Sequence, residues 1–86
     1  MEQRKAKVLV VDDSSFLRKL MVRLMAENPA IEVVGEARNG KEALELTEKL
    51  RPDVITLDIN MPVMDGLTAL KEIMNSFPTP VIMVSS

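Results

Sequence analysis

The 86 residues carry a formal net charge of −2, with 47% hydrophobic and 28% charged residues, which is an ordinary balance for one small globular domain. Cysteine and histidine are both missing, which excludes disulfides, thiolate metal sites and the commonest general base, so any metal must be held by oxygen ligands. The slightly acidic balance, the 2% aromatic content and the lack of a long apolar run argue against nucleic acid or a membrane as partner. We therefore expect a cytoplasmic protein.

Apolar strand-like runs alternate with helical patterns along the chain. Four strands are expected, at residues 8–11, 31–37, 53–58 and 81–84. Three helices are expected between them, with apolar residues recurring over 16–25, 43–50 and 67–77. Ser14 or Ser15 can cap the first helix and Asn39 the second, and the charges of Arg18, Lys19 and Arg23 fall elsewhere on the first helical wheel. This alternation predicts an α/β fold with a parallel sheet and helices on both faces.

Acidic residues follow two of these strands at the point where each strand ends. Asp12 and Asp13 come directly after the first strand, and Asp58 ends the third. In a flavodoxin-like sheet the ligand crevice lies beyond the carboxyl ends of the first and third strands, so the three carboxylates should share one crevice. Clustered carboxylates need a counter-charge to stay ionised, and a magnesium ion could supply it. A carboxylate beside such an ion could attack phosphorus.

Each acidic residue also has a simpler interpretation. The Asp-Asp-Ser-Ser run could be only a turn and a helix cap, at about even odds when it is taken alone. A single strand-end Asp58 is more often a turn or cap residue than a nucleophile, and Asp65-Gly66 is a common turn pair. The functional interpretation is favoured because the acids fall at the ends of the two strands that should flank the crevice.

Four segments together resemble the receiver domains of bacterial two-component response regulators. They are residues 10–14 (VVDDS), 53–58 (DVITLD), 61–66 (MPVMDG) and 80–85 (PVIMVS). The resemblance runs through essentially the whole chain and is greatest to the receivers of the chemotaxis protein-glutamate methylesterases, CheB. It implies a flavodoxin-like (CheY-like) doubly wound parallel sheet with strand order 2-1-3-4.

The resemblance also implies a role for each site residue. Asp58 would accept a phosphoryl group from the phosphohistidine of a partner histidine kinase. Asp13 would bind Mg²⁺ directly and Asp12 largely through water. The backbone carbonyl of Asn60 would be a further metal ligand, and Ser85 would be the switch hydroxyl that bonds the phosphoryl group.

Two features depart from the family pattern. Asn60 stands where methylesterase receivers often carry a glutamate. The sequence also stops after the fourth strand, so we expect residues 1–86 to form a partial receiver without the fourth helix, the fifth strand with its lysine, and the fifth helix. Phosphoryl transfer should then be impaired, and no methylesterase domain is expected here. Because the missing helices would leave sheet faces bare, we expect a symmetric homodimer or association with a complementary fragment.

Other functions remain open at this point. A haloacid-dehalogenase-type phosphatase also uses a strand-end aspartate, but its motif needs a second aspartate where this chain has Asn60, two residues after Asp58. A dinucleotide-binding domain would need a G-x-G-x-x-G after the first strand, and none is there. The strongest alternative is a shortened receiver fragment that acts only as a structural or self-associating building block without signalling.

Overall fold

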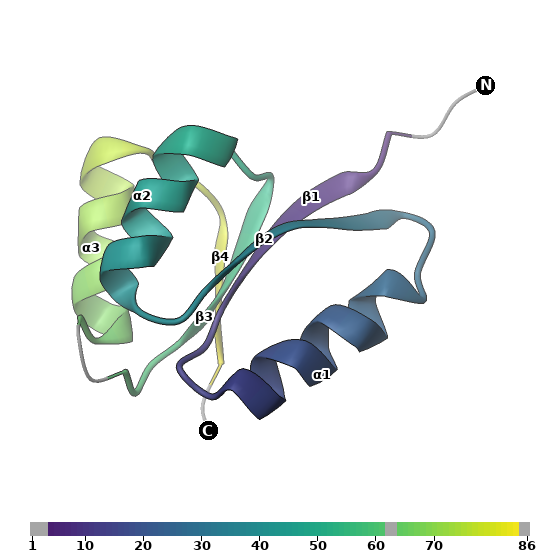
Figure 1. Cartoon of the computed structure of the whole chain (residues 1–86). Helices are drawn as coiled ribbons and strands as arrows, with labels where there is room; N and C mark the ends of the chain where they lie inside the picture. Colours follow the sequence, from purple (N-terminus) through teal and green to yellow (C-terminus); the bar gives the residue numbers. More distant parts are fainter. Residues whose placement is uncertain (1–3, 62–63, 85–86) are drawn as a thin grey trace.

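The computed structural model describes residues 4–61 and 64–84, in which strands and helices alternate along the chain (Figure 1). The strands are β1 (Ala6–Val11), β2 (Ile31–Ala37), β3 (Val54–Asp58) and β4 (Val81–Val84). The helices are α1 (Ser15–Ala26), α2 (Gly40–Leu50) and α3 (Gly66–Ser76). All strand pairs are parallel and lie in the order β2-β1-β3-β4, which confirms the predicted doubly wound sheet.

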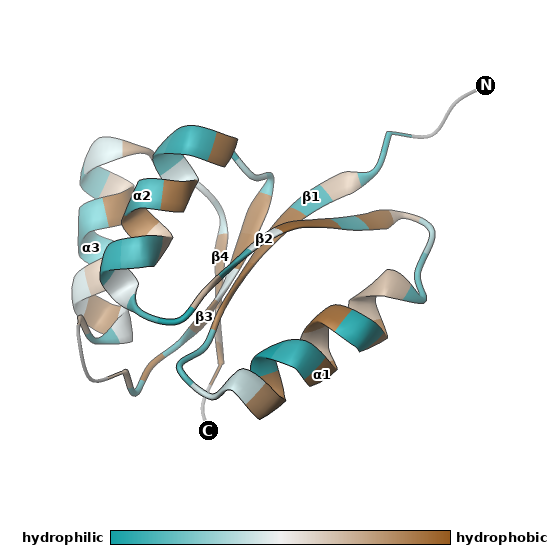
Figure 2. Cartoon of the chain, in the orientation of Figure 1, coloured by the Kyte–Doolittle hydropathy of each residue, from teal (hydrophilic) through white to brown (hydrophobic). Residues whose placement is uncertain are grey.

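The two faces of the sheet have different partners. Helices α2 and α3 lie side by side on one face, and α1 covers part of the other (Figure 1). Because side chains alternate along a strand, β1 and β3 send every second residue to each face. The core between the sheet and the helices α2 and α3 includes Leu9, Val11, Ile55 and Leu57, all essentially inaccessible to solvent. In the hydropathy view the strands carry hydrophobic stretches with hydrophilic bands between them, as in β2 (Figure 2).

The α1 side of the sheet is less well covered. Val8 and Val10 are buried there, but Ile82, which lies opposite Thr56 in the ladder between β3 and β4, is 57% exposed. Helix α1 itself leaves Phe16 75% and Leu24 57% exposed. Exposed apolar side chains therefore lie on both α1 and β4 in the described part of the chain.

Each helix begins at the carboxyl end of a strand with a side-chain cap. The Ser14 hydroxyl, rather than that of Ser15, accepts a hydrogen bond from the Leu17 amide at 3.2 Å. The Asn39 side chain caps α2, as predicted, and Asp65 caps α3. Because the carboxylate of Asp65 accepts a backbone hydrogen bond from Thr68, the pKa of Asp65 is lowered. These caps fix where the chain turns at the end of the sheet that carries the acids.

Strand β2 contains an irregularity that the sequence did not reveal. Val8 is opposite Val33, but the next residue, Leu9, is opposite Gly35, so β2 holds one extra residue at this point. The shift places Glu36 opposite Val10, on the α1 side, and Ala37 opposite Val11, in the core.

Among residues 4–61 and 64–84, no helix has the length and apolar character needed to cross a bilayer.

Candidate functional site

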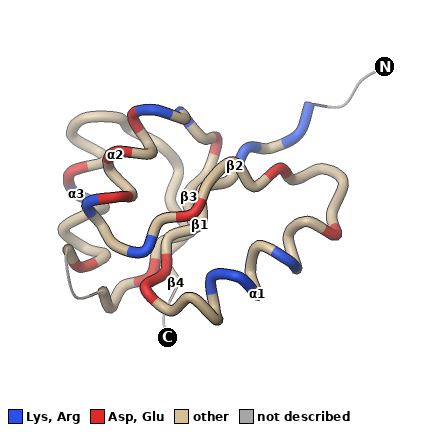
Figure 3. The backbone as a smooth tube through the Cα atoms, in the orientation of Figure 1, with Lys and Arg blue, Asp and Glu red and all other residues tan. Residues whose placement is uncertain are grey.

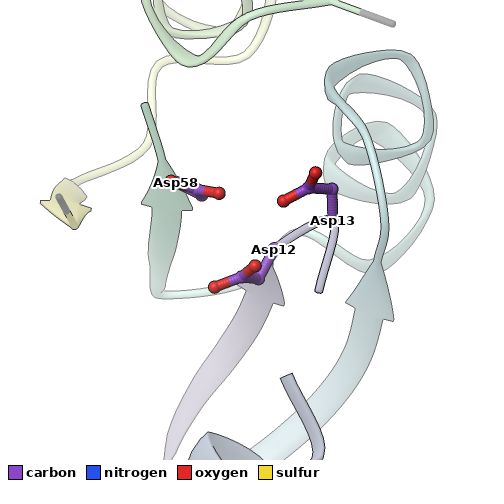
Figure 4. Close-up of side chains that lie close together, drawn as sticks. All are labelled: Asp12, Asp13 and Asp58. Atoms are coloured by element: carbon purple, nitrogen blue, oxygen red, sulfur yellow. The ribbon is translucent and has the colours of Figure 1, made fainter. Parts of the chain in front are cut away.

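Strand pairing brings the acids at the ends of β1 and β3 together. Val10 pairs with Thr56 and Val11 with Leu57, so the next residue of each strand, Asp12 and Asp58, also lie side by side. The close-up shows Asp12 and Asp58 at the two strand ends, with Asp13 on the turn that follows β1 (Figure 4). One carboxylate oxygen from each residue can be chosen so that all three lie within 4.8 Å of one another. The predicted acidic cluster is thus present.

Three hydrogen bonds fix Asp12, through its backbone N–H, its carboxylate and its carbonyl group. Its backbone N–H donates to the Ala37 carbonyl at 3.0 Å, and its Oδ1 accepts from the Ser14 amide at 2.9 Å. Its carbonyl accepts from the Arg18 guanidinium at 2.8 Å. Asp12 is only 4% exposed, whereas Asp13 lies at the surface. The cluster therefore has a buried, fixed side and an open side.

Burial and charge both act on Asp58, which is 2% exposed. Burial raises the pKa of its carboxyl group, and repulsion from Asp12 and a hydrogen bond with Asp13 raise it further. The Asn60 amide donates to Asp58 Oδ1 at 3.2 Å and opposes this rise. Ionised Asp58 is therefore destabilised unless positive charge enters the site.

The donor set fits a hard divalent cation. Three carboxylates converge on one point and no histidine or cysteine exists in the chain, which matches the oxygen ligands that Mg²⁺ prefers. A cation held by Asp12, Asp13 and Asp58 would also offset the repulsion that raises the pKa of Asp58. The proposed carbonyl ligand, Asn60, follows Asp58 by two residues and stays a prediction. The predicted switch residue Ser85 lies outside the described residues.

The first residue of α3 packs closely against the backbone of Asp58 and Ile59. Gly66, the first residue of α3, donates its N–H to the Ile59 carbonyl at 2.9 Å. A Cβ placed on Gly66 would collide with the Asp58 carbonyl oxygen and lie 2.7 Å from the Ile59 Cα. Gly40 at the start of α2 meets Met64 in a similar way, with its Cβ position 2.6 Å from the Met64 carbonyl oxygen. Both glycines thus allow close packing at the loop between β3 and α3, where a side chain on either of them would collide with the backbone.

The chain matches the response regulator receiver domain family over residues 8–86. It belongs to the response-regulator receiver family. This receiver is 61% identical over 80 residues to a protein-glutamate methylesterase/protein-glutamine glutaminase of Photobacterium profundum, which covers 93% of the chain and 20% of that protein. A protein of the same name from Pyrococcus horikoshii is 57% identical over 83 residues, with 96% and 23% covered. The receiver therefore spans about a fifth of the length of these curated relatives.

Solved structures give the same assignment. The response regulator domain of Thermotoga maritima CheB superposes with a TM-score of 0.94 at 52% identity, covering 96% of this receiver and 62% of that chain. A chain of the CheX-CheY-BeF3-Mg complex from Borrelia burgdorferi superposes with a TM-score of 0.88 at 35% identity, covering 95% and 63%. The expected CheY-like fold and the resemblance to CheB receivers are both confirmed.

Sequence reasoning missed two residues that shape the site. Arg18 was predicted only to fall away from the apolar residues of the first helical wheel, but just 13% of its side chain is exposed and it donates a hydrogen bond to the Asp12 carbonyl. Gly66 was regarded as half of a turn pair, whereas its position is fixed by contact with the backbone of β3. A signal for Arg18 existed in the pairing of a helical cation with Glu36 on the next strand, but only the structure shows which cation is used.

The contact of Gly66 with β3 yields the first prediction. Gly66→Ala should destabilise the fold by roughly 1–3 kcal/mol, because the new methyl group must displace the backbone of Asp58 and Ile59. Asn75→Ala in the last turn of α3 is a control, since this exposed residue should gain slightly from the higher helix propensity of alanine. Urea unfolding measures both changes. A Gly66→Ala chain as stable as the parent would contradict the close approach.

The raised pKa of Asp58 yields a second prediction. Because the folded chain binds this proton more tightly than the unfolded chain, ionising Asp58 lowers stability. The loss is absent below the ordinary aspartate pKa of about 3.9 and complete above the raised pKa. In metal-free buffer, Asp58→Asn should therefore stabilise the fold near neutral pH, by on the order of 1 kcal/mol, and have little effect in acid.

The control for this second prediction lies at the other end of the same strand. Asp53 precedes β3 and accepts a hydrogen bond from the Lys7 amide at 2.8 Å, far from the acidic cluster. Asp53→Asn should give no gain in stability at any pH. Equal effects of the two variants in urea unfolding at neutral pH would argue against repulsion within the cluster.

Proposed function

We propose that this receiver accepts a phosphoryl group on Asp58, with Mg²⁺ held by Asp12, Asp13, Asp58 and the Asn60 carbonyl. The observation that carries the proposal is the convergence of three carboxylates within 4.8 Å at the ends of β1 and β3. Structural reasons alone do not favour such a cluster, because it buries like charges and raises the pKa of Asp58. An acidic cluster that is present despite this unfavourable burial and repulsion is typical of a functional site.

The proposed reaction moves one phosphoryl group between two carriers. A carboxylate oxygen of Asp58 forms a bond to phosphorus, and the bond from phosphorus to the imidazole nitrogen of the kinase phosphohistidine breaks. The departing imidazole keeps the electron pair and takes up a proton. The missing histidine in this chain is consistent with that division, since the histidine belongs to the donor. The Asn60 N–H, 3.2 Å from Asp58 Oδ1, holds the nucleophile in orientation.

Charge neutralisation is the main requirement of this reaction. The cation supplies positive charge for the carboxylates and for the oxygens of the transferring group. Asp12 is fixed by the Ser14 amide and the Ala37 carbonyl, so its carboxylate direction is set before any ligand enters. The Borrelia structure is a CheX-CheY-BeF3-Mg complex, and the presence of that ion with a similar fold favours the same use here.

The proposal is limited to phosphoryl acceptance. The methylesterase and glutaminase activities in the names of the curated relatives belong to those proteins, of which this receiver spans about a fifth. A histidine kinase as donor, a role in chemotaxis signalling and a cytoplasmic location remain parts of the proposal, as does the switch role of Ser85. The alternative remains a receiver fragment with a purely structural role.

Phosphoryl transfer from a small acyl phosphate tests the acceptor. With Mg²⁺ present, intact-protein mass spectrometry should show the addition of one phosphoryl group, and hydroxylamine should remove it because the product is an acyl phosphate. Asp58→Asn should abolish the addition, whereas Asp53→Asn should leave it intact. Chelation of Mg²⁺ should suppress it. A phosphorylated Asp58→Asn chain would exclude Asp58 as the acceptor, and no addition to the parent would leave the structural alternative.

We also propose that the 86-residue chain self-associates through the exposed apolar surface of α1 and β4. Phe16, Leu24 and Ile82 are each more than half exposed, and β4 is the outer strand of the described sheet. Open apolar strand edges favour pairing with another copy. Sedimentation over a wide concentration range should therefore show a dimer in the parent chain.

Two substitutions to lysine test whether this apolar surface forms the contact between the copies. Ile82→Lys should shift the sedimentation equilibrium to monomer by placing a cation on the outer strand. Leu67→Lys is the control, because Leu67 is 63% exposed but lies on α3, on the opposite face of the sheet. A parent chain that stays monomeric at high concentration would refute self-association, and equal loss in both variants would refute this choice of surface.

A further inference from the structure

The Arg18 side chain lies beneath the acidic site instead of in solvent. Only 13% of it is exposed, and it donates in two directions. Its Nη1 donates to the Asp12 carbonyl at 2.8 Å, and its Nε donates to Glu36 Oε1 at 3.1 Å. Because the guanidinium is planar and rigid, two bonds from different nitrogens fix its orientation. In Figure 3 basic residues of α1 lie beside the acidic turn after β1.

The group that Arg18 holds belongs to the peptide bond between the two metal-binding acids. The Asp12 carbonyl, the Asp13 nitrogen and both Cα atoms lie in one plane. Fixing that carbonyl fixes the direction in which the chain continues, and so the position of the Asp13 Cα atom from which its side chain projects. The Asp12 N–H is already held by Ala37, and its carboxylate by Ser14. Arg18 supplies the remaining restraint.

Glu36 anchors the guanidinium from β2. The extra residue in that strand sets Glu36 opposite Val10, on the α1 side of the sheet. The ammonium group of Lys19 also lies 3.3 Å from Glu36 Oε1, so one carboxylate faces two cations. Lys19 contacts Glu36 from a side chain that is 69% exposed, whereas Arg18 bridges Glu36 and the Asp12 carbonyl. Arg18 is therefore the cation that links Glu36 to the acidic turn.

We infer that Arg18 is a positioning residue: it sets the Asp12–Asp13 peptide so that both carboxylates face the metal site. The part of this inference that concerns the metal rests on the proposed function. A cation near the site would by charge alone weaken Mg²⁺ binding, since like charges repel. Positioning has the opposite effect, because correctly placed ligands strengthen binding. The two roles thus differ in the sign of their effect on Mg²⁺ affinity.

Arg18→Lys separates the two roles because it keeps the charge and loses the rigid two-sided donor. Mg²⁺ affinity, measured from amide shifts around Asp13 and Asp58, should fall about tenfold, as when an outer hydrogen bond to a metal site is lost. Arg18→Met should also weaken binding, although charge alone predicts tighter binding. Arg23→Met removes the same charge from the exposed part of α1 and should leave affinity near that of the parent.

Hydrogen exchange in the metal-free chain tests the restraint independently of metal. The Ser14 amide, bonded to Asp12 Oδ1, should exchange roughly fivefold faster in Arg18→Lys, the factor that one typical hydrogen bond contributes. The Ile55 amide, which donates to the Pro80 carbonyl at 2.9 Å in the buried sheet, is the reference within the same sample. A rise in the Ser14 rate that exceeds any rise at Ile55 distinguishes loss of the local restraint from global destabilisation.

The outcomes distinguish this inference from the proposed function. Faster Ser14 exchange with weaker Mg²⁺ binding in Arg18→Lys is the expected result. An unchanged ratio of exchange rates, or tighter Mg²⁺ binding in both Arg18 variants, would overturn the positioning role. A parent chain that shows no response to Mg²⁺ would overturn the metal site of the proposed function, while Ser14 exchange would still decide whether Arg18 holds the peptide. If Arg18→Met does not fold, Arg18→Lys alone carries the test.

Discussion

Repulsion among three carboxylates at one end of a parallel sheet is the constraint on which the rest of this structure depends. Asp58 is buried beside Asp12 and Asp13, and burial together with repulsion from Asp12 and Asp13 raises the pKa of its carboxyl group. The fold maintains this arrangement through restraints on the backbone. The ladder between β1 and β3 sets the strand ends side by side, and hydrogen bonds to Asp12 fix the turn that follows.

Stability for this arrangement comes from a different part of the molecule. The apolar residues of β1 and β3 that face α2 and α3 are fully buried, and they include Leu9, Ile55 and Leu57. Successive residues of one strand therefore serve the core and the α1 side in turn, and the strand then ends in an acid. Substitutions in the core would disturb the site chiefly through this shared backbone, since the core side chains point away from the α1 side.

The strand and helix positions and the acids at the strand ends could be predicted from local patterns, whereas the sheet order 2-1-3-4 came from the resemblance to receiver domains. Buried runs mark parallel strands, and the acids at residues 12, 13 and 58 follow two of those strands directly. The choice between Ser14 and Ser15 as cap could not be made, since both fit the same preference. Spacing alone also could not show that Leu67 in α3 faces solvent while Ala69 is buried, because the apolar pattern of a helix gives no weight to small residues.

Contacts between distant residues lay beyond the sequence. Arg18, Lys19 and Arg23 are equivalent as helical cations, and only the packing of α1 on β2 selects Arg18 for the Asp12 carbonyl. The close approach of Gly66 to Asp58 depends on how α3 begins above the sheet. The roles of the metal, the Asn60 carbonyl and Ser85 stay predictions, because each depends on how the site binds an ion or a phosphoryl group.

The extra residue in β2 has a consequence for how this sequence can change length. Side chains along a strand alternate between the two faces of the sheet. The unpaired Val34 reverses, for the residues after it, which face each one occupies. A regular ladder that included Val34 would pair Glu36 with Val11, which would turn Glu36 toward the apolar side under α2 and remove the partner of Arg18. Loss of the extra residue would instead leave Glu36 opposite Val10. Functional relatives that are one residue shorter at this point should therefore still place their acid beside the cation of α1.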